Sequence, residues 1–312
     1  MKQPTAANLT TDHLDPRAVE RIVRAALEED LGGPDGVDVT SAATVAEEAR
    51  DTAELVARAD GVLAGMSVAA AVFDLAAEAA GVGAVKFDPL RQDGDAVRRG
   101  DVLAVVEGPT RSLLTAERTA LNLLCRISGV ATATARWAQE LRGTGAQVLD
   151  TRKTTPGLRL LEKYAVRVGG GGNKRMGLHD VAMVKDNHKL AAGGVGAAYR
   201  RVREAYPEVP VEVEVTTVDE ALEAVDAGAD FLLCDNMTPE QLRNVVEQVA
   251  GRAKLEATGG LTLSRARAYA ETGVDFISVG ALTHSAPILD IALDLRPRKP
   301  DQPIASEAAT GE

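Results

Sequence analysis

The stretch VEVEVTTVDEALEAVDAGADFLLCDNMTPEQLRNVVEQVAGRAKLEATGGLTLSRARAYAETGVDFISVG, residues 211–280, decides the fold. Four short apolar runs in it are typical of β-strands, and they end near Glu214, Asp235, Thr258 and Gly280. The segments between the runs look helical. One strand with the helix after it therefore takes about 20 to 25 residues, and a series of such units indicates a parallel sheet.

Two of the linking segments carry signals for the start of a helix. Thr217 with Glu220 has the capping-box pattern, and Thr238, Pro239 and Gln241 form a second N-terminal pattern. Repeated strand–helix units build either an open sheet or a closed barrel. We favour closure, because two further strands precede this stretch and bring the number of parallel strands to at least six.

Those two strands are expected over residues 148–151 and 181–185. Six strands suit a barrel slightly smaller than the usual eight. Thr155 with Pro156 is expected to start a helix after the first of them, and the glycine run 169–172 to end it. The second half of the chain is thus predicted to be an incomplete, mostly parallel α/β barrel.

The first half has a different pattern, which predicts a small α+β unit. Apolar positions recur at helical spacing over 15–31, and Gly32-Gly33-Pro34 ends that helix. Strands are expected over 55–63 and 102–106, with a helix over 67–80 between them. A long helical segment over 111–141, with a candidate break at Ser128-Gly129, leads into the second half. The fold class is therefore α/β, and the chain divides into a mobile tail (1–12), an N-terminal α/β domain with the bridging helix (13–128), an α/β-barrel domain (129–296) and a second mobile tail (297–312).

Composition and charge exclude several classes of protein. The 312 residues include 46 acidic and 35 basic ones, a formal net charge of −11, which disfavours nucleic acid and anionic membranes as partners. No run approaches the roughly 18 to 20 apolar residues of a membrane span, and the start lacks the apolar region of a signal peptide, so we expect a cytoplasmic protein. Cys125 and Cys234 lie in apolar segments and are expected to be buried, reduced thiols.

Positive charge gathers in one part of this acidic chain, residues 150–189. We expect Arg159, Lys163 and Arg167, in the predicted helix, to solvate a helix face. Four other cations there stand beside strand ends and glycine runs, where side chains can converge on a ligand: Arg152, Lys153, Arg175 and Lys185. This local contrast points to a small polyanionic substrate.

Polar residues follow almost every predicted barrel strand. In parallel barrels the site lies at the carboxyl ends of the strands, so these residues are expected to meet at one mouth. Glu214 and Asp235 end apolar runs, where a carboxylate needs a cation or a hydrogen-bond donor. Three uses remain open for this pair: binding sugar hydroxyls, coordinating Mg²⁺ around a diphosphate, or making internal ion pairs.

The last two strands offer backbone N–H groups for a phosphate. Thr258-Gly259-Gly260 and Gly280 stand near helix N-termini, which is how barrels commonly hold phosphate. His284, just beyond Gly280, is a candidate phosphate contact or a packing residue. His188 is expected to support the site, and His179 to be an ordinary packing or hydrogen-bonding residue.

The chain resembles a known family, the quinolinate phosphoribosyltransferases, also called carboxylating nicotinate-nucleotide pyrophosphorylases. The similarity covers nearly everything between the tails. It rests on motifs that occur in the order typical of the family: ERTALNLLCRISGVAT from Glu117, DTRKTTPGLRLLEKYAV from Asp150, GGGGNKRMGLHD from Gly169, VKDNH from Val184, VEVEV from Val211, CDNM from Cys234, EATGG from Glu256 and SVGALTHSAP from Ser278.

The resemblance implies an N-terminal α/β domain and an incomplete α/β barrel. It also implies a homodimer, or a hexamer built from dimers, in which the partner's N-terminal part completes each barrel mouth. The implied activity is that of a decarboxylating pentosyltransferase. Quinolinate and phosphoribosyl pyrophosphate would give nicotinate mononucleotide, pyrophosphate and carbon dioxide, as a step of NAD synthesis.

The resemblance further implies a role for each matching residue. Arg152, Lys174, Arg175 and Lys185 would bind quinolinate, with Arg118 reaching over from the partner subunit. Catalysis and phosphoribosyl pyrophosphate binding would use Lys153, Glu214 and Asp235, the two carboxylates also holding Mg²⁺ directly or through water. The 5′-phosphate would contact Thr258, Gly259, Gly260, Gly280 and His284.

One residue departs from the family pattern. Family members usually read Asn-His-Arg where this chain has Asn173-Lys174-Arg175, so lysine replaces a histidine that contacts quinolinate. Lysine keeps a cationic donor, but its point-charge geometry differs. We expect the enzyme to tolerate the change; altered specificity and loss of activity are the alternatives.

Three other functions are weighed against this one. Phosphoribosyl transfer to another pyridine acid such as nicotinate would leave the second carboxylate pocket without purpose. A non-catalytic sensor of phosphoribosyl pyrophosphate would need an output module, which nothing in the chain resembles. An aldolase-like barrel could use Lys185 as a Schiff-base nucleophile, which borohydride trapping would detect.

Overall fold

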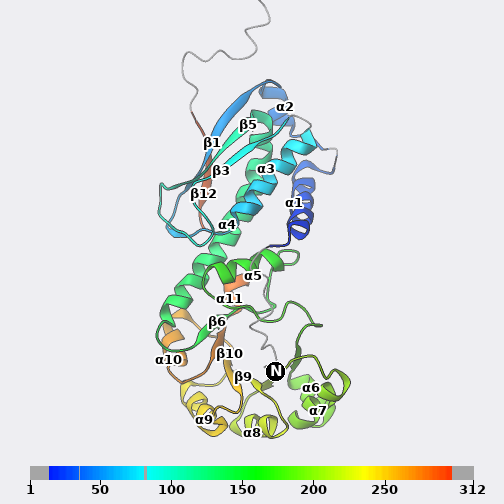
Figure 1. Ribbon diagram of the computed structural model, residues 1–312, viewed down its shortest axis with the longest axis vertical. Helices are drawn as coiled ribbons and strands as arrows, with labels where there is room; N and C mark the ends of the chain where they lie inside the picture. Colours follow the sequence, from blue (N-terminus) through cyan, green and yellow to red (C-terminus); the bar gives the residue numbers. More distant parts are fainter. Residues whose placement is uncertain (1–13, 35, 81–82, 297–312) are drawn as a thin grey trace, which may run out of the picture. The chain divides into compact units, whose positions relative to one another are not determined.

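The computed structural model describes residues 14–34, 36–80 and 83–296 (Figure 1). They form two compact units. One comprises residues 133–286, and the other comprises residues 14–132 together with 287–296. The two expected tails, 1–12 and 297–312, lie outside the described residues.

The unit of residues 133–286 contains a six-stranded sheet in which neighbouring strands are parallel. The strand order is β6-β11-β10-β9-β8-β7, and no pairing between the described strands joins β6 to β7. The sheet is thus an incomplete α/β barrel, and all six predicted strands are confirmed. The strands are β6 (Gln147–Leu149), β7 (Ala182–Val184), β8 (Val211–Val215), β9 (Phe231–Asp235), β10 (Lys254–Thr258) and β11 (Phe276–Ser278).

Helices connect these strands, and side chains fix where several of them begin. Thr238 forms a complete capping box with Gln241, as predicted. Thr217 accepts a hydrogen bond from Glu220 N, but the Glu220 carboxylate binds Thr216 N instead of closing the box. The helices are α5 (Arg159–Val168), α6 (Asp186–Ala192), α7 (Val195–Ala205), α8 (Val218–Asp226), α9 (Pro239–Val249), the short 3₁₀ helix η2 (Leu263–Arg265), α10 (Ala266–Ala270) and α11 (Ala281–His284).

The helix after β6 begins later than predicted. The expectation that Thr155 and Pro156 start it is wrong, because α5 begins at Arg159. The Thr155 N–H and hydroxyl both bind the Glu162 carboxylate, at 3.0 and 2.7 Å, and Gly157 has a φ of 82°. These contacts hold the chain in a turn ahead of the helix.

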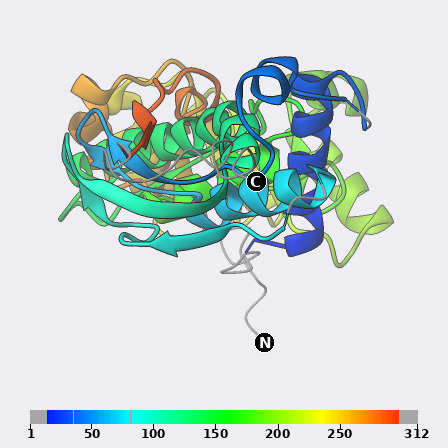
Figure 2. The same cartoon turned by 90° about the horizontal axis from the view of Figure 1, so that it is seen from above.

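The other unit is built on a four-stranded antiparallel sheet in the order β12-β1-β5-β3. Helix α1 packs beside α3 in this unit (Figures 1 and 2). The predicted strand over 55–63 is in fact the end of β1 and the separate short strand β2. The elements are α1 (Pro16–Leu31), α2 (Val39–Thr44), β1 (Arg50–Ala57), β2 (Gly61–Val62), α3 (Met66–Ala80), β3 (Lys86–Pro89), β4 (Ala96–Val97), β5 (Val102–Pro109) and β12 (Ile291–Leu295).

The end of the described chain belongs with this sheet. The sequence placed residues 287–296 in the barrel domain, whereas β12 pairs with β1 from Ala57↔Ile291 to Ala53↔Leu295. Antiparallel pairing over such a sequence separation leaves no local pattern in the five residues of the strand. The strand–helix repeat therefore does not show which sheet this strand joins.

Helix α4 (Thr110–Glu140) runs without interruption through the candidate break at Ser128-Gly129. The Ser128 hydroxyl binds both the N–H and the carbonyl oxygen of Ala64, each at 3.0 Å. At Gly129 a Cβ atom would lie 2.2 Å from the carbonyl oxygen of Pro287. The small residues thus allow backbone to approach the helix closely, and they do not end it.

Both cysteines are buried, as expected, and unpaired. Burial raises the pKa of the Cys234 thiol to about 12, so this group stays protonated at neutral pH. None of the described helices is long and apolar enough to cross a membrane.

The contact at Gly129 gives a test of the helix. Gly129→Ala is expected to lower the free energy of unfolding by about 1 to 3 kcal/mol, because the added methyl overlaps the Pro287 carbonyl oxygen. Arg136→Ala, on an exposed position of α4, is the control and should change stability by less than about 0.5 kcal/mol. Urea denaturation measures both, and an equal effect would refute the close approach.

Candidate functional site

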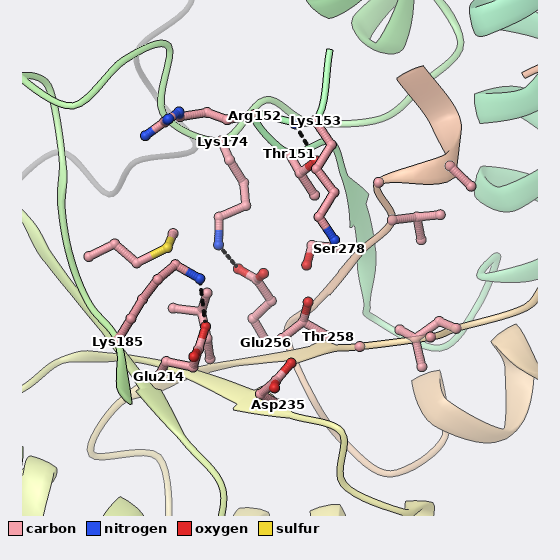
Figure 3. Close-up of a pocket in the computed structure, with 18 of the residues that line it drawn as sticks. Thr151, Arg152, Lys153, Lys174, Lys185, Glu214, Asp235, Glu256, Thr258 and Ser278 are labelled. Carbon is pink, nitrogen blue, oxygen red and sulfur yellow. Dashed lines mark hydrogen bonds and ion pairs between the residues drawn. The ribbon is translucent and has the colours of Figure 1, made fainter. Parts of the chain in front are cut away.

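A cavity of about 650 Å³ opens at the carboxyl ends of the barrel strands (Figure 3). Every site residue predicted from the sequence lines it except Arg118, which lies in α4. The predicted residues that line it are Arg152, Lys153, Lys174, Arg175, Lys185, Glu214, Asp235, Thr258, Gly259, Gly260, Gly280 and His284. The topology of the barrel therefore brings together side chains that are up to 132 positions apart in the sequence.

Two carboxylates stand on one wall of the cavity, at the ends of β8 and β9. Glu214 Oε2 lies 2.8 Å from Lys185 Nζ, so one of the three uses considered for this pair, an internal ion pair, is present at Glu214. Asp235 accepts a hydrogen bond of 2.8 Å from the side chain of Asn236, which has a φ of 55°. A carboxylate held by one neighbour keeps other lone pairs for a ligand.

Two arginines contribute positive charge to the cavity. Arg175 donates to the Val181 carbonyl oxygen at 2.9 Å. Burial lowers the pKa of Arg175, and the nearby Arg152 lowers it further. Arg152 Nε is buried without a hydrogen-bond partner among the described residues. Neighbouring guanidinium groups that repel each other are stabilised when an anion binds between them.

Glycines shape the opposite end of the cavity. Gly259 and Gly260 have positive φ values of 92° and 58°. At Gly280 a Cβ atom would lie 2.9 Å from the Lys153 side chain and 3.2 Å from the His284 ring. The absence of side chains here leaves backbone and the Lys153 and His284 tips open to a ligand.

A buried lysine ties together two basic segments that line the cavity. The expectation that Lys163 solvates a helix face is wrong, because its side chain is only 2% exposed. Its ammonium group forms an ion pair with Asp150 and donates to the Lys174 carbonyl oxygen at 3.0 Å. Asp150 also accepts hydrogen bonds from Asn173 Nδ2 at 2.6 Å and from Lys174 N at 2.8 Å.

Asp150 and Lys163 therefore join two segments of the chain. One segment leads into Arg152, and the other, at Lys174, leads into Arg175. Burial lowers the pKa of Lys163 and raises that of Asp150, and each charge opposes the shift of the other. Arg159 also reaches into the protein and donates to the Met176 carbonyl oxygen at 2.9 Å. The helix face that the sequence assigned to solvent thus supports the cavity.

Two glutamates that were not predicted from the sequence lie at the base of the cavity, and Glu256 lines it. Lys174 Nζ is 2.6 Å from Glu256 Oε2 and 3.0 Å from Glu212 Oε2. Both glutamates are almost fully buried, and burial raises the pKa of Glu212. The sequence did hold a signal for them: each is a charged residue within a buried strand, VEVEV or KLEAT. Because a carboxylate buried in a strand needs a partner, such a residue predicts a buried cation nearby.

Among the described residues, two histidines do not line the cavity, and their positions differ. His188 Nδ1 accepts a hydrogen bond of 3.0 Å from Lys185 N and so caps the start of α6 beside the site, which agrees with a supporting role. His179 is exposed and does not line the cavity.

The Asp150–Lys163 pair gives a test of the support under the site. Lys163→Met is expected to lower the free energy of unfolding by about 3 to 5 kcal/mol, because it leaves the Asp150 carboxylate buried without its cation. The control is Lys254→Met, which removes an exposed ion pair with Asp275 and should cost less than about 1 kcal/mol. Similar losses in urea denaturation would contradict a buried pair.

Comparison with known proteins agrees with this geometry. The model of the N-terminal domain of quinolinate phosphoribosyl transferase matches residues 38–128, and the model of its C-terminal domain matches residues 130–294. The nicotinate-nucleotide pyrophosphorylase [carboxylating] of Mycobacterium leprae is 47% identical over 281 residues, which cover 89% of this chain and 97% of that protein. A probable enzyme of the same name from Bacillus subtilis is 42% identical and covers 86% of this chain and 90% of its own length.

Solved structures give the same result. The crystal structure of NadC from Streptococcus pyogenes superposes with a TM-score of 0.86 at 40% identity and covers 92% of this chain and 99% of its own. The nicotinate-nucleotide pyrophosphorylase of Francisella tularensis superposes with a TM-score of 0.84 at 35% identity, over 94% of this chain and 100% of its own.

Proposed function

The chain belongs to the quinolinate phosphoribosyltransferase family, and from this premise we propose that it converts quinolinate and phosphoribosyl pyrophosphate into nicotinate mononucleotide, pyrophosphate and carbon dioxide. This reaction supplies NAD synthesis. One observation carries the proposal most directly: a single cavity holds a group of cations suited to a pyridine dicarboxylate beside two carboxylates suited to a sugar. The product and both substrates are small molecules that such a cavity can enclose.

Arg152, Arg175 and Lys185 are proposed to bind the two carboxylates of quinolinate. Guanidinium groups bind carboxylates through paired hydrogen bonds, and the buried, unpartnered Arg152 Nε supplies a donor that needs an acceptor. Arg118 would join them from a second copy of the chain, which makes the functional form a homodimer or a larger assembly of dimers. The low pKa expected for both substrate carboxylates keeps the substrate a dianion at neutral pH.

Phosphoribosyl pyrophosphate is proposed to occupy the rest of the cavity. Lys153 would bind the pyrophosphate, and Glu214 and Asp235 the ribose hydroxyls. The 5′-phosphate would contact the glycine-rich end, where Gly259 and Gly260 expose backbone N–H groups. Thr258, Gly280 and His284 line the same end.

The residues present also fit Mg²⁺. This ion is commonly held by one or two carboxylates together with substrate phosphates. Among the described residues no group of three or more His, Cys, Asp or Glu side chains forms a metal cluster, whereas Glu214 and Asp235 line one cavity. We propose that these two carboxylates hold Mg²⁺, directly or through water. When bound, the ion neutralises charge on the pyrophosphate.

The reaction then requires positioning more than acid–base chemistry. The bond between the ribose carbon and the pyrophosphate oxygen breaks with its electron pair on the oxygen, while Glu214 and Asp235 stabilise the positive charge on the sugar. The lone pair of the pyridine nitrogen forms the new bond to that carbon. The positively charged ring stabilises the electron pair left as the adjacent carboxylate departs as carbon dioxide, and that carbon takes a proton from water.

The assay that tests this function supplies Mg²⁺, phosphoribosyl pyrophosphate and either quinolinate or nicotinate. Quinolinate should give one carbon dioxide for each mononucleotide, and nicotinate should give no product, because the second cationic subsite then lacks its carboxylate. Removal of Mg²⁺ with EDTA should reduce the rate to background, and added Mg²⁺ should restore it.

Other outcomes would replace the proposal. Product from nicotinate without carbon dioxide would identify a different pyridine acid as substrate. Absence of product from both acids, with phosphoribosyl pyrophosphate still bound, would favour a sensor. Covalent trapping of substrate on Lys185 by borohydride would favour Schiff-base chemistry, which the ion pair of Lys185 with Glu214 argues against.

A further inference from the structure

Lys174, Glu212 and Glu256 form a buried group of charges at the base of the cavity, called the floor cluster below. The Lys174 side chain is 5% exposed, Glu212 is 2% exposed and Glu256 is fully buried. Figure 3 shows the Lys174 side chain extending into the cavity and ending at Glu256. Lys174 Nζ also lies 5.7 Å from the centre of the Phe231 ring, a favourable position for a cation.

The two glutamates lie one layer below the residues assigned to the substrate. Glu212 precedes Glu214 by two positions on β8, and Glu256 precedes Thr258 by two positions on β10. Residues two apart on a strand share a face of the sheet. The floor cluster therefore stands directly beneath the mouth of the cavity, on the inner side of the barrel.

With both glutamates ionised, the cluster carries a net negative charge. Two carboxylates and one ammonium group carry a formal charge of −1, and the second oxygen of each glutamate, Oε1, has no hydrogen-bond partner among the described residues. Without the lysine the same place would carry a formal charge of −2. Negative charge beneath the cavity opposes the entry of a dianion, and burial leaves this repulsion poorly screened.

On the basis of the function proposed above, we infer that Lys174 is a positioning residue: by pairing with Glu212 and Glu256 it lowers the negative charge beneath the cavity and so permits a dicarboxylate to bind. The affinity for quinolinate depends on this pairing and not on a bond from the lysine to the substrate. A move of the ammonium toward a substrate carboxylate would leave a buried glutamate without its cation, which is costly. Lys174 thus serves to neutralise part of the charge of Glu212 and Glu256.

Two variants separate pairing from direct contact. Lys174→Met removes the charge with little change of volume and brings the formal charge of the cluster to −2. Lys174→Met combined with Glu256→Gln restores −1, the native value, without restoring the lysine. Quinolinate affinity is measured by calorimetry at about pH 8, where a proton shared by two carboxylates is least able to replace the lysine. KM for each substrate and the melting temperature are measured alongside.

Lys174→Met is expected to weaken quinolinate binding at least ten-fold, to leave KM for phosphoribosyl pyrophosphate within about three-fold, and to lower the melting temperature. The double variant should regain most of the quinolinate affinity and of the melting temperature. The matched control is Lys189→Met, because Lys189 is also a buried lysine between two carboxylates, Asp186 and Glu220, but does not line the cavity. It should lower the melting temperature without changing quinolinate affinity.

A double variant that regains stability but stays at least ten-fold weak for quinolinate would overturn the inference and show that Lys174 contacts the substrate. If Lys174→Met does not fold, the double variant is compared with the unmodified chain, and the same ten-fold criterion applies. Calorimetry keeps this test separate from the proposed function. An unmodified chain that binds quinolinate but makes no nicotinate mononucleotide would refute the proposed function only, and one that does not bind quinolinate would refute both.

Discussion

The buried ion pair between Asp150 and Lys163 is the interaction on which the rest of the site depends. Arg152 and Arg175 lie on separate segments, 23 positions apart, and neither segment is part of a strand or helix at the arginine itself. Asp150 follows the first barrel strand, Lys163 lies on α5, and together they bind the backbone of Lys174. One carboxylate and one ammonium group therefore set the distance between the two arginines that an anion must bridge.

The barrel also arranges charge in two layers at the cavity. The floor cluster of Lys174, Glu212 and Glu256 is buried, and the ion pair of Lys185 with Glu214 stands above it at the cavity. Each carboxylate near the cavity thus has a cationic neighbour or a hydrogen-bond donor, and the arginines have charge left for a ligand. Such an arrangement suits a dianion and a sugar bound side by side, as proposed above, and the parallel sheet fixes the spacing of the charges.

The sequence predicted the barrel and the cavity well and their support poorly. Strand ends recur regularly, so Glu214, Asp235 and Thr258 were placed at one mouth from the repeat alone. The role of Lys163 was not predicted, because helical spacing shows which positions share a face and not whether another segment covers that face. The pairing of β12 with β1 and the close backbone contact at Gly129 were missed for the same reason: both depend on distant parts of the chain.

We propose that Asp150 and Lys163 position the cations that would bind quinolinate. Calorimetric titration of quinolinate into the double variant Asp150→Leu with Lys163→Met tests it most directly, because replacing both partners avoids leaving either one as an unpaired buried charge. The expected result is a folded protein whose affinity for quinolinate has fallen at least ten-fold. A folded variant with unchanged affinity would show that the two basic segments hold their positions without the pair, and would contradict the account.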